Sequence, residues 1–170
     1  MLYLAYGSNM APPRIEARLG ACVFIGIGWL EETRIAFHKR GRDGSGKCNA
    51  HLTGNPEDRL YGVLFGLSEA QGRTLDGFEG PGYYRRVMPV RTDAGVRFAY
   101  TYVAKDAHVT DGLIPYDWYK AFVVSGASEA GLPVGYQTKL AKVPANVDPD
   151  ESRRSINFDI LARESVDAST

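Results

Sequence analysis

Glu79 is the side chain with the clearest potential for acid–base chemistry. It lies four residues after Leu75 on a predicted helix, so it shares a face with a residue expected to be buried. It also ends that helix, where the helix dipole disfavours negative charge, and Asp76 adds a second negative charge three residues earlier. Burial, the dipole and a like charge all raise the pKa of a carboxyl group, as a general base near neutral pH requires. The alternative is a glutamate that only ends a helix, which is the usual role at such a position.

A turn near the N-terminus is the second chemical feature. The apolar and aromatic residues 2–6 predict a strand that stops at Gly7, a residue that lets a ligand approach the main chain. Ser8 and Asn9 follow, and the two prolines at 12–13 suit the first turn of a helix. Such a junction presents several free N–H groups in one concavity, which can bind an anion or the oxyanion of a reacting carbonyl. A plain strand-to-helix turn is the alternative.

Three segments resemble motifs of the γ-glutamylcyclotransferase family. They are Tyr3-Leu4-Ala5-Tyr6-Gly7-Ser8-Asn9, then Leu75-Asp76-Gly77-Phe78-Glu79-Gly80, then Tyr119 with Gly126-Ala127, Gly131-Leu132-Pro133 and Tyr136. They occur in the order of the family and at similar spacing, from residue 2 to about residue 140. The resemblance implies a small β-barrel flanked by helices. It also implies an enzyme that cyclises a γ-glutamyl amide to 5-oxoproline and releases an amine or amino acid, without a metal or cofactor.

The resemblance also implies a role for individual residues. Glu79 would be the proton acceptor, and the turn of Tyr6, Gly7 and Ser8 would bind the substrate and its oxyanion. The remaining substrate-binding positions are expected at Tyr3, Leu4, Ala5 and Asn9 in the same loop, and at Tyr102 and Tyr119.

The segment after Glu79 departs from part of the family. Residues 81–86 are shorter than the corresponding loop of some relatives and closer to the pattern of the γ-glutamylamine branch. The sequence therefore leaves open whether Tyr83 or Tyr84 faces the pocket, and which amine leaves. Arg85 and Arg86 alternate on a predicted strand, so at most one of them can point into the cavity.

Two nucleophilic mechanisms are alternatives to this interpretation. Ser8 as the nucleophile of a hydrolase would need a histidine base, and no motif links His38, His51 or His108 to it. Cys48 lies in a basic stretch expected to be a flexible loop, with no neighbouring base. Neither mechanism is favoured.

A non-catalytic binding or regulatory module of the same fold is the alternative from a different functional class. A pure binder has little use for a partly buried carboxylate, so Glu79 argues against it.

Composition narrows the partners and the compartment. The chain has 170 residues with 20 basic and 20 acidic side chains, so its charge predicts no nucleic acid and no anionic membrane surface as partner. The longest apolar run, residues 22–30, is too short to span a bilayer, and no secretory leader is evident. Cys22 and Cys48 show no metal-binding or redox spacing, as in a reducing compartment. We expect a cytoplasmic protein that binds a small γ-glutamyl substrate. The oligomeric state stays open, a homodimer included.

The elements expected to position these residues form an α+β domain. Helices are predicted at 12–19, 68–79, 116–130 and 132–142, and strands at 2–6, 22–31, 34–38, 50–53, 60–67, 83–91 and 96–104. Ser68 and Gln71 are expected to form a capping box at the start of the second helix, and Gly80 to end it. The strand at 22–31 is expected to carry an apolar face of Val23, Ile25, Ile27 and Trp29, and the last two strands to form a hairpin. So many short strands favour a closed barrel. Residues 40–47 are expected to be a mobile, solvated loop. The domain is expected to span residues 1–148, with a charged tail at 149–170 that is either docked or frayed.

Overall fold

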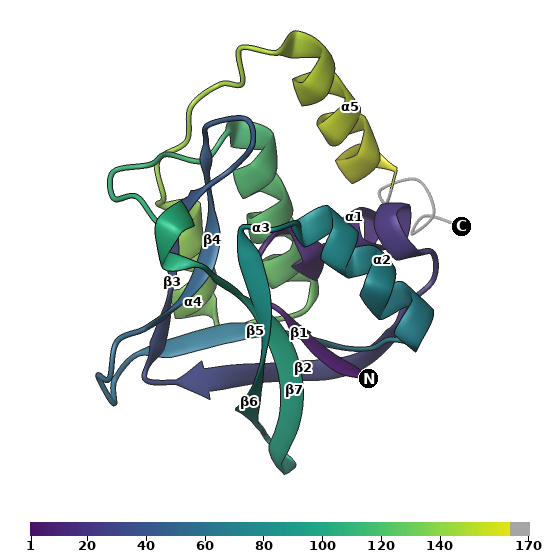
Figure 1. The fold of residues 1–170 in the computed structure, drawn as a ribbon, viewed down its shortest axis with the longest axis vertical. Coiled ribbons are helices and arrows are strands. Elements are labelled where there is room, and N and C mark those ends of the chain that lie inside the picture. The colour runs from purple at the N-terminus through teal and green to yellow at the C-terminus, as the bar shows by residue number, and fades with distance from the viewer. Residues whose placement is uncertain (164–170) are drawn as a thin grey trace.

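Five strands close into a mixed barrel in the computed structural model, which describes residues 1–163. In barrel order they are β1 (Leu2–Ala5), β5 (Arg59–Gly66), β2 (Val23–Glu31), β6 (Tyr83–Thr92) and β7 (Gly95–Ala104). β1 pairs antiparallel with β5 and parallel with β7, which closes the barrel (Figure 1). The prediction of a small mixed barrel in an α+β domain is confirmed.

A second sheet of two strands stands beside the barrel. It consists of β3 (Thr33–Arg40) and β4 (Gly46–Leu52). Asn49 attaches it to β7, because its Oδ1 accepts a hydrogen bond of 2.8 Å from the Ala104 amide while its Nδ2 lies 2.9 Å from His38 Nε2. This sheet supplies one wall of the cavity described below.

The prediction of a mobile, solvated loop at residues 40–47 is wrong. Both strands extend into it, and only a short turn remains, closed by a hydrogen bond of 2.8 Å from the Gly41 amide to the Ser45 carbonyl. Asp43 holds this turn by accepting hydrogen bonds from Ser45 and from the Lys47 ammonium at 2.7 Å. The side chains of Asp43 and Lys47 are only 12% and 14% exposed, so the turn is packed rather than solvated.

Within residues 1–163, five helices lie to one side of the barrel (Figure 1). They are α1 (Pro12–Leu19), α2 (Glu69–Glu79), α3 (Asp117–Glu129), α4 (Val134–Ala141) and α5 (Glu151–Ala162), with the short 3-10 helices η1 (Ser8–Met10) and η2 (Asp106–His108). Helix α5 packs on α1 and α3. The predicted capping box of α2 is present: Ser68 accepts from the Gln71 amide, and Gln71 accepts from the Ser68 amide. Gly80 ends this helix in the left-handed region, with φ of 68°, as expected of a helix stop.

Polar contacts dock α5 onto the rest of the protein. Arg153 forms an ion pair with the buried Asp148, which also accepts a hydrogen bond of 2.6 Å from the Trp118 indole. The hydrogen bond from Arg153 lowers the pKa of Asp148 to about 2. Arg154 forms a second ion pair, of 2.6 Å, with Asp117 on α3. Most of the charged tail is therefore a docked helix, while residues 164–170 lie outside the described part of the chain.

The predicted apolar face of β2 is interrupted. That prediction placed four side chains on one face: Val23, Ile25, Ile27 and Trp29. A register shift between Phe24 and Gly26, where Gly26 has φ of 146°, moves Val23 to the face of Gly28 and Leu30. The bulge shifts the alternation of side chains between the two faces of β2. The prediction that the four residues form one continuous face is therefore wrong.

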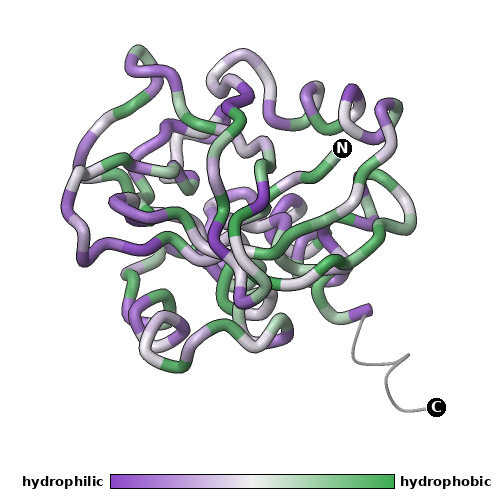
Figure 2. Tube along the Cα trace, turned by 90° about the horizontal axis from the view of Figure 1, so that it is seen from below, coloured by the Kyte–Doolittle hydropathy of each residue, from purple (hydrophilic) through white to green (hydrophobic). Residues whose placement is uncertain are grey.

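The hydrophobic core lies inside the barrel and between the barrel and its helices. Leu4, Leu64 and Val90 are fully buried on the strands, and Ile15 and Phe122 on the helices. Figure 2 shows apolar segments along the central strands, including β1, and long hydrophilic stretches at the rim. Among residues 1–163, no helix is long and apolar enough to cross a membrane.

The contact of α3 with η1 holds the N-terminal turn, and it depends on Gly126. A side chain at this position would overlap the backbone of Met10 and Ala11. We expect Gly126→Ala to lower the free energy of unfolding by about 2 kcal/mol, because a packed backbone contact must open. Thermal denaturation should show this as a drop in Tm of about 4–8 °C.

Gly135→Ala is the matched control. Gly135 is also helical, on α4, and an added methyl group would meet no atom within 4 Å. Its stability should be unchanged, or raised by up to about 1 kcal/mol through helix propensity. Equal effects of the two substitutions would show that the α3–η1 contact is not tight.

Candidate active site

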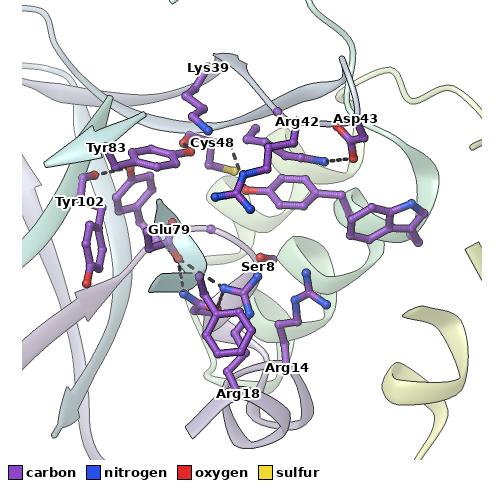
Figure 3. Close-up of a pocket in the computed structure, with 18 of the residues that line it drawn as sticks. Ser8, Arg14, Arg18, Lys39, Arg42, Asp43, Cys48, Glu79, Tyr83 and Tyr102 are labelled. Atoms are coloured by element: carbon purple, nitrogen blue, oxygen red, sulfur yellow. Dashed lines mark hydrogen bonds and ion pairs between the residues drawn. The ribbon is translucent and has the colours of Figure 1, made fainter. Parts of the chain in front are cut away.

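A cavity of about 400 Å³ lies where the turn after β1 meets the end of α2. Its other walls come from α1, the β3–β4 hairpin, the start of β6 and the start of α3. Figure 3 shows that side chains from these distant segments converge on it. The cavity thus lies between the two chemical features of the sequence.

Glu79, the last residue of α2, faces this cavity (Figure 3). Its side chain is 16% exposed. Its Oε1 accepts hydrogen bonds from Asn9 Nδ2 at 3.0 Å and from Arg18 Nη1 at 3.3 Å. Arg18 also donates to Asn9 Oδ1 at 2.8 Å, which closes a ring of three side chains. The ring links the N-terminal turn and α1 directly to the end of α2.

Asp76 does not act as the free negative charge that the sequence suggested. Its Oδ1 accepts hydrogen bonds from Arg85 Nε at 2.6 Å and from the Tyr102 hydroxyl at 2.8 Å. The cation of Arg85 compensates the negative charge of Asp76. The prediction that Asp76 acts on Glu79 as an uncompensated like charge is therefore wrong. The charge nearest to Glu79 is instead Arg18, which the sequence analysis did not identify.

The turn at Gly7 is shaped by a close approach rather than by unusual backbone angles. Gly7 has φ of −114°, outside the left-handed region. An added Cβ would lie 3.2 Å from both Cys48 Cβ and the Tyr119 hydroxyl, so a larger residue would push these neighbours apart. Among residues 1–163, the amides of Gly7, Ser8 and Asn9 donate to no protein acceptor. Gly7, Ser8 and Asn9 all line the cavity, so free N–H groups are available beside it.

Five tyrosines of the described residues 1–163 surround the cavity: Tyr3, Tyr6, Tyr83, Tyr102 and Tyr119. The Tyr6 hydroxyl donates to the Tyr102 carbonyl at 2.5 Å, and the Tyr119 hydroxyl accepts from the Cys48 amide at 3.1 Å. Burial raises the pKa of Tyr3, Tyr6, Tyr83 and Tyr119 well above its usual value. These phenols are therefore neutral hydrogen-bonding groups.

The structure decides which residues of β6 face the cavity. Tyr83 lines it and donates a hydrogen bond of 2.6 Å to the Cys48 carbonyl. Tyr84 is 42% exposed and, like Arg86, lines a separate groove beside β3 and β4. Arg85 pairs with Asp76 and Arg86 lines this separate groove, so neither of the two arginines reaches the cavity.

Two of the predicted substrate-binding residues are placed elsewhere. Leu4 and Ala5 are fully buried in β1, paired with Leu64 and Val63 of β5, and they do not line the cavity. The structure brings the other predicted residues together around it: Tyr3, Tyr6, Gly7, Ser8, Asn9, Glu79, Tyr102 and Tyr119.

The sequence did not predict that lysine and arginine side chains line much of the cavity. Arg14 and Arg18 lie four residues apart on α1 and both reach the cavity. Their spacing on the helix after the glycine turn was a usable signal. Lys39, Arg42 and Lys47 come from the β3–β4 hairpin, whose position over the barrel the sequence did not predict.

Neither nucleophilic alternative is supported by the geometry. No histidine of the described chain lines the cavity, so Ser8 has no imidazole base. Cys48 does line it, but as a buried residue of β4 rather than of a flexible loop. Burial raises the pKa of the Cys48 thiol to about 12, which opposes formation of the reactive thiolate.

Comparison with known proteins indicates the same family that the sequence motifs resemble. The model of the AIG2-like family matches residues 59–140, which include Glu79 and Tyr119. Bovine γ-glutamylcyclotransferase is 28% identical over 152 residues, covering 85% of this chain and 79% of its own. The human γ-glutamylcyclotransferase is 28% identical over 155 residues, with the same coverage.

Solved structures agree in fold. A γ-glutamyl cyclotransferase structure superposes with a TM-score of 0.80 at 25% identity, covering 95% of this chain and 98% of that one. In sequence and in fold, the chain is similar to the AIG2-like/γ-glutamylcyclotransferase family. A human protein solved as uncharacterized superposes with a TM-score of 0.77 at 27% identity, over 85% of this chain and 88% of its own. These proteins share the barrel and its surrounding helices with this chain.

The burial of Cys48 makes a testable difference to its reactivity. At pH 8 a thiol with a pKa near 12 is ionised on the order of once in ten thousand molecules. Cys22 is only partly buried. We expect iodoacetamide to modify Cys22 of the native protein at least about tenfold faster than Cys48, as followed by peptide mass spectrometry.

Denatured protein is the control, in which both thiols should react at similar rates. Rapid labelling of Cys48 in the native protein would contradict its placement and would revive the thiol as a candidate nucleophile.

Proposed function

We propose that this protein is a γ-glutamylcyclotransferase that converts a γ-glutamyl amide to 5-oxoproline and releases the amine or amino acid. One observation carries the proposal: the carboxylate of Glu79 and the unpaired amides of the 7–9 turn line one cavity. The 28% identity to the bovine and human γ-glutamylcyclotransferases and the fold shared with a solved γ-glutamyl cyclotransferase support it.

Glu79 would act as the general base. A γ-glutamyl amide carries its own nucleophile, the α-amine, which is protonated and unreactive at neutral pH. Glu79 would remove a proton from this ammonium, and the free amine would attack the γ-carbonyl carbon to close a five-membered ring. Because the attack is intramolecular, the cavity mainly has to fold the substrate into a reactive conformation.

The 7–9 turn would stabilise the charge that develops. Attack converts the carbonyl oxygen into an oxyanion, and the amides of Gly7 and Ser8 are free to donate to it. The tetrahedral intermediate then breaks its bond to the leaving nitrogen. Protonated Glu79 would return its proton to that nitrogen, so one carboxyl group serves both steps. The ring nitrogen would give up its second proton to the released amine, which leaves as an ammonium ion.

Asn9 and Arg18 would position the base. Both donate to Oε1 of Glu79. Among residues 1–163 no hydrogen-bond donor contacts Oε2, which leaves this oxygen to meet the substrate ammonium. Arg18 is held in turn by the Phe78 ring, whose centroid lies 5.1 Å from its guanidinium carbon.

Replacement of Glu79 tests the proposal. We expect Glu79→Gln to lower kcat for 5-oxoproline formation by about 10²–10⁴-fold, because an amide cannot accept the proton. KM should change much less, because glutamine keeps the size and hydrogen bonds of the side chain. A panel of γ-glutamyl amino acids and γ-glutamyl amines, assayed for 5-oxoproline by chromatography, provides the measurement.

Glu69→Gln is the matched control, because this glutamate lies on the same helix, is exposed and is remote from the cavity. It should keep full activity. Full activity of Glu79→Gln would overturn the assignment of the base. Binding of a γ-glutamyl compound without turnover by the wild-type protein would favour the binding-module alternative.

A further inference from the structure

Positive charge dominates the cavity. Six cationic side chains of residues 1–163 line it: Arg14, Arg18, Lys39, Arg42, Lys47 and Arg153. Within the same range only two carboxylates do so, Asp43 and Glu79. This excess concerns the bound molecule directly, because charges that face a partly closed cavity must be compensated there.

Half of these cations have a carboxylate partner. Arg18 pairs with Glu79 at 3.3 Å and Lys47 with Asp43 at 2.7 Å. Arg153 pairs with Asp148, which lies behind the cavity wall. The ion pairs of residues 1–163 leave three cavity cations without a carboxylate partner, namely Arg14, Lys39 and Arg42.

Two of these unpaired cations are removed from bulk water. Lys39 is 7% exposed, and its ammonium lies 4.5 Å from the centre of the Tyr83 ring. Arg14 donates from Nη1 to Asn157 at 2.7 Å, but its Nε is buried without a hydrogen-bond partner in the described chain. Burial, and then the neighbouring Arg18, lower the pKa of Arg14 to about 10. A bound anion would relieve both sites.

The unpaired cations lie on two sides of the reacting groups. Figure 3 shows Lys39 and Arg42 above Glu79 and Ser8, and Arg14 below them. Arg42 is exposed at the edge of the cavity, on the turn between β3 and β4, whereas Arg14 belongs to the helix that follows the 7–9 turn. A substrate therefore meets positive charge at both of its ends.

Counting the charges of candidate substrates separates them. The γ-glutamyl group brings one carboxylate and the ammonium that Glu79 would deprotonate. A neutral amine as leaving group adds no anion, a neutral amino acid adds one carboxylate, and an acidic amino acid adds two. Only the last supplies one carboxylate for each of the three unpaired cations.

We propose that the cavity prefers a γ-glutamyl compound whose leaving group is an acidic amino acid. Arg14 would bind the glutamyl carboxylate and Lys39 the α-carboxylate of the leaving group. Arg42, at the edge of the cavity, would bind the side-chain carboxylate of the leaving group. The inference rests on the proposed function and narrows its substrate class. It gives the β3–β4 hairpin a role in specificity.

The test compares three substrates of similar size: γ-glutamylglutamate, γ-glutamylglutamine and γ-glutamylbutylamide. We expect kcat/KM to fall by about tenfold or more at each step of this series, because each step removes one charge-assisted interaction. The preference for γ-glutamylglutamate over γ-glutamylglutamine should shrink at high NaCl concentration, since salt screens the attraction. Equal or faster turnover of γ-glutamylglutamine would overturn the inference.

Arg42→Gln tests the assignment of the hairpin. This residue is exposed, so its replacement should leave the fold intact. The preference for glutamate over glutamine as leaving group should fall about tenfold in this variant. Arg40→Gln is the control, because Arg40 is an exposed residue of the same hairpin outside the cavity lining, and it should keep the preference. An unchanged preference in Arg42→Gln would contradict the assignment.

Binding separates failure of this inference from failure of the proposed function. If no substrate yields 5-oxoproline, the function fails, and calorimetric titration of the wild-type protein with γ-glutamylglutamate and γ-glutamylglutamine still measures the charge preference. At least about tenfold tighter binding of γ-glutamylglutamate would support the cationic specificity. Equal affinities, or no binding of either compound, would overturn it.

Discussion

The hydrogen-bonded ring of Asn9, Arg18 and Glu79 is the interaction on which the site depends. It joins the turn after β1 and the adjacent helix α1 to the end of α2, which lies about sixty to seventy residues later in the sequence. The ring therefore holds the carboxylate in a fixed relation to the free amides of the turn. The barrel supports the same arrangement. Strand β1 leads into the turn and pairs with β5, and β5 is followed by α2.

The close packing of small residues lets this arrangement form. Gly7 allows Cys48 and Tyr119 to approach the turn, and Gly126 allows α3 to pack directly on η1. The turn is thus held between a strand of the second sheet and a helix of the C-terminal half. The amides that face the cavity are therefore presented by a supported piece of backbone, as an oxyanion site requires.

The features that the sequence predicted well are local. The capping box of Ser68 and Gln71, the stop at Gly80 and the hairpin of β6 and β7 each depend on residues next to one another in the chain. Glu79 could be singled out because a buried helix face and a helix end are both visible in a short segment. The motif resemblance supplied the pairing of Glu79 with the N-terminal turn, which no local pattern contains.

The features that the sequence did not predict depend on register or on distant contacts. The bulge at Gly26 changes which side chains of β2 share a face of the sheet. The alternation of side chains along β6 likewise decides that Tyr83 rather than Tyr84 faces the cavity. The basic residues at 40–47 suggested solvent exposure because nothing nearby in the sequence shows that some of them face a cavity.

Electrostatics connects these errors to function. Asp76, expected to repel Glu79, is compensated by Arg85, and the cavity is instead surrounded by cations drawn from α1, the β3–β4 hairpin and α5. A cationic cavity in which Asp43 is paired with Lys47 and Glu79 lies beside the 7–9 turn suits a substrate that carries carboxylates and a single ammonium. The barrel and helices place these charges, and the charges set what the cavity can bind.

The most direct test of the account is a crystal structure of the Glu79→Gln variant with an uncleaved γ-glutamyl substrate. The account predicts the γ-carbonyl oxygen within about 3 Å of the Gly7 or Ser8 amide, with the α-amino nitrogen beside the side chain of residue 79. A substrate bound outside this cavity, or with its γ-carbonyl turned away from the 7–9 turn, would contradict it.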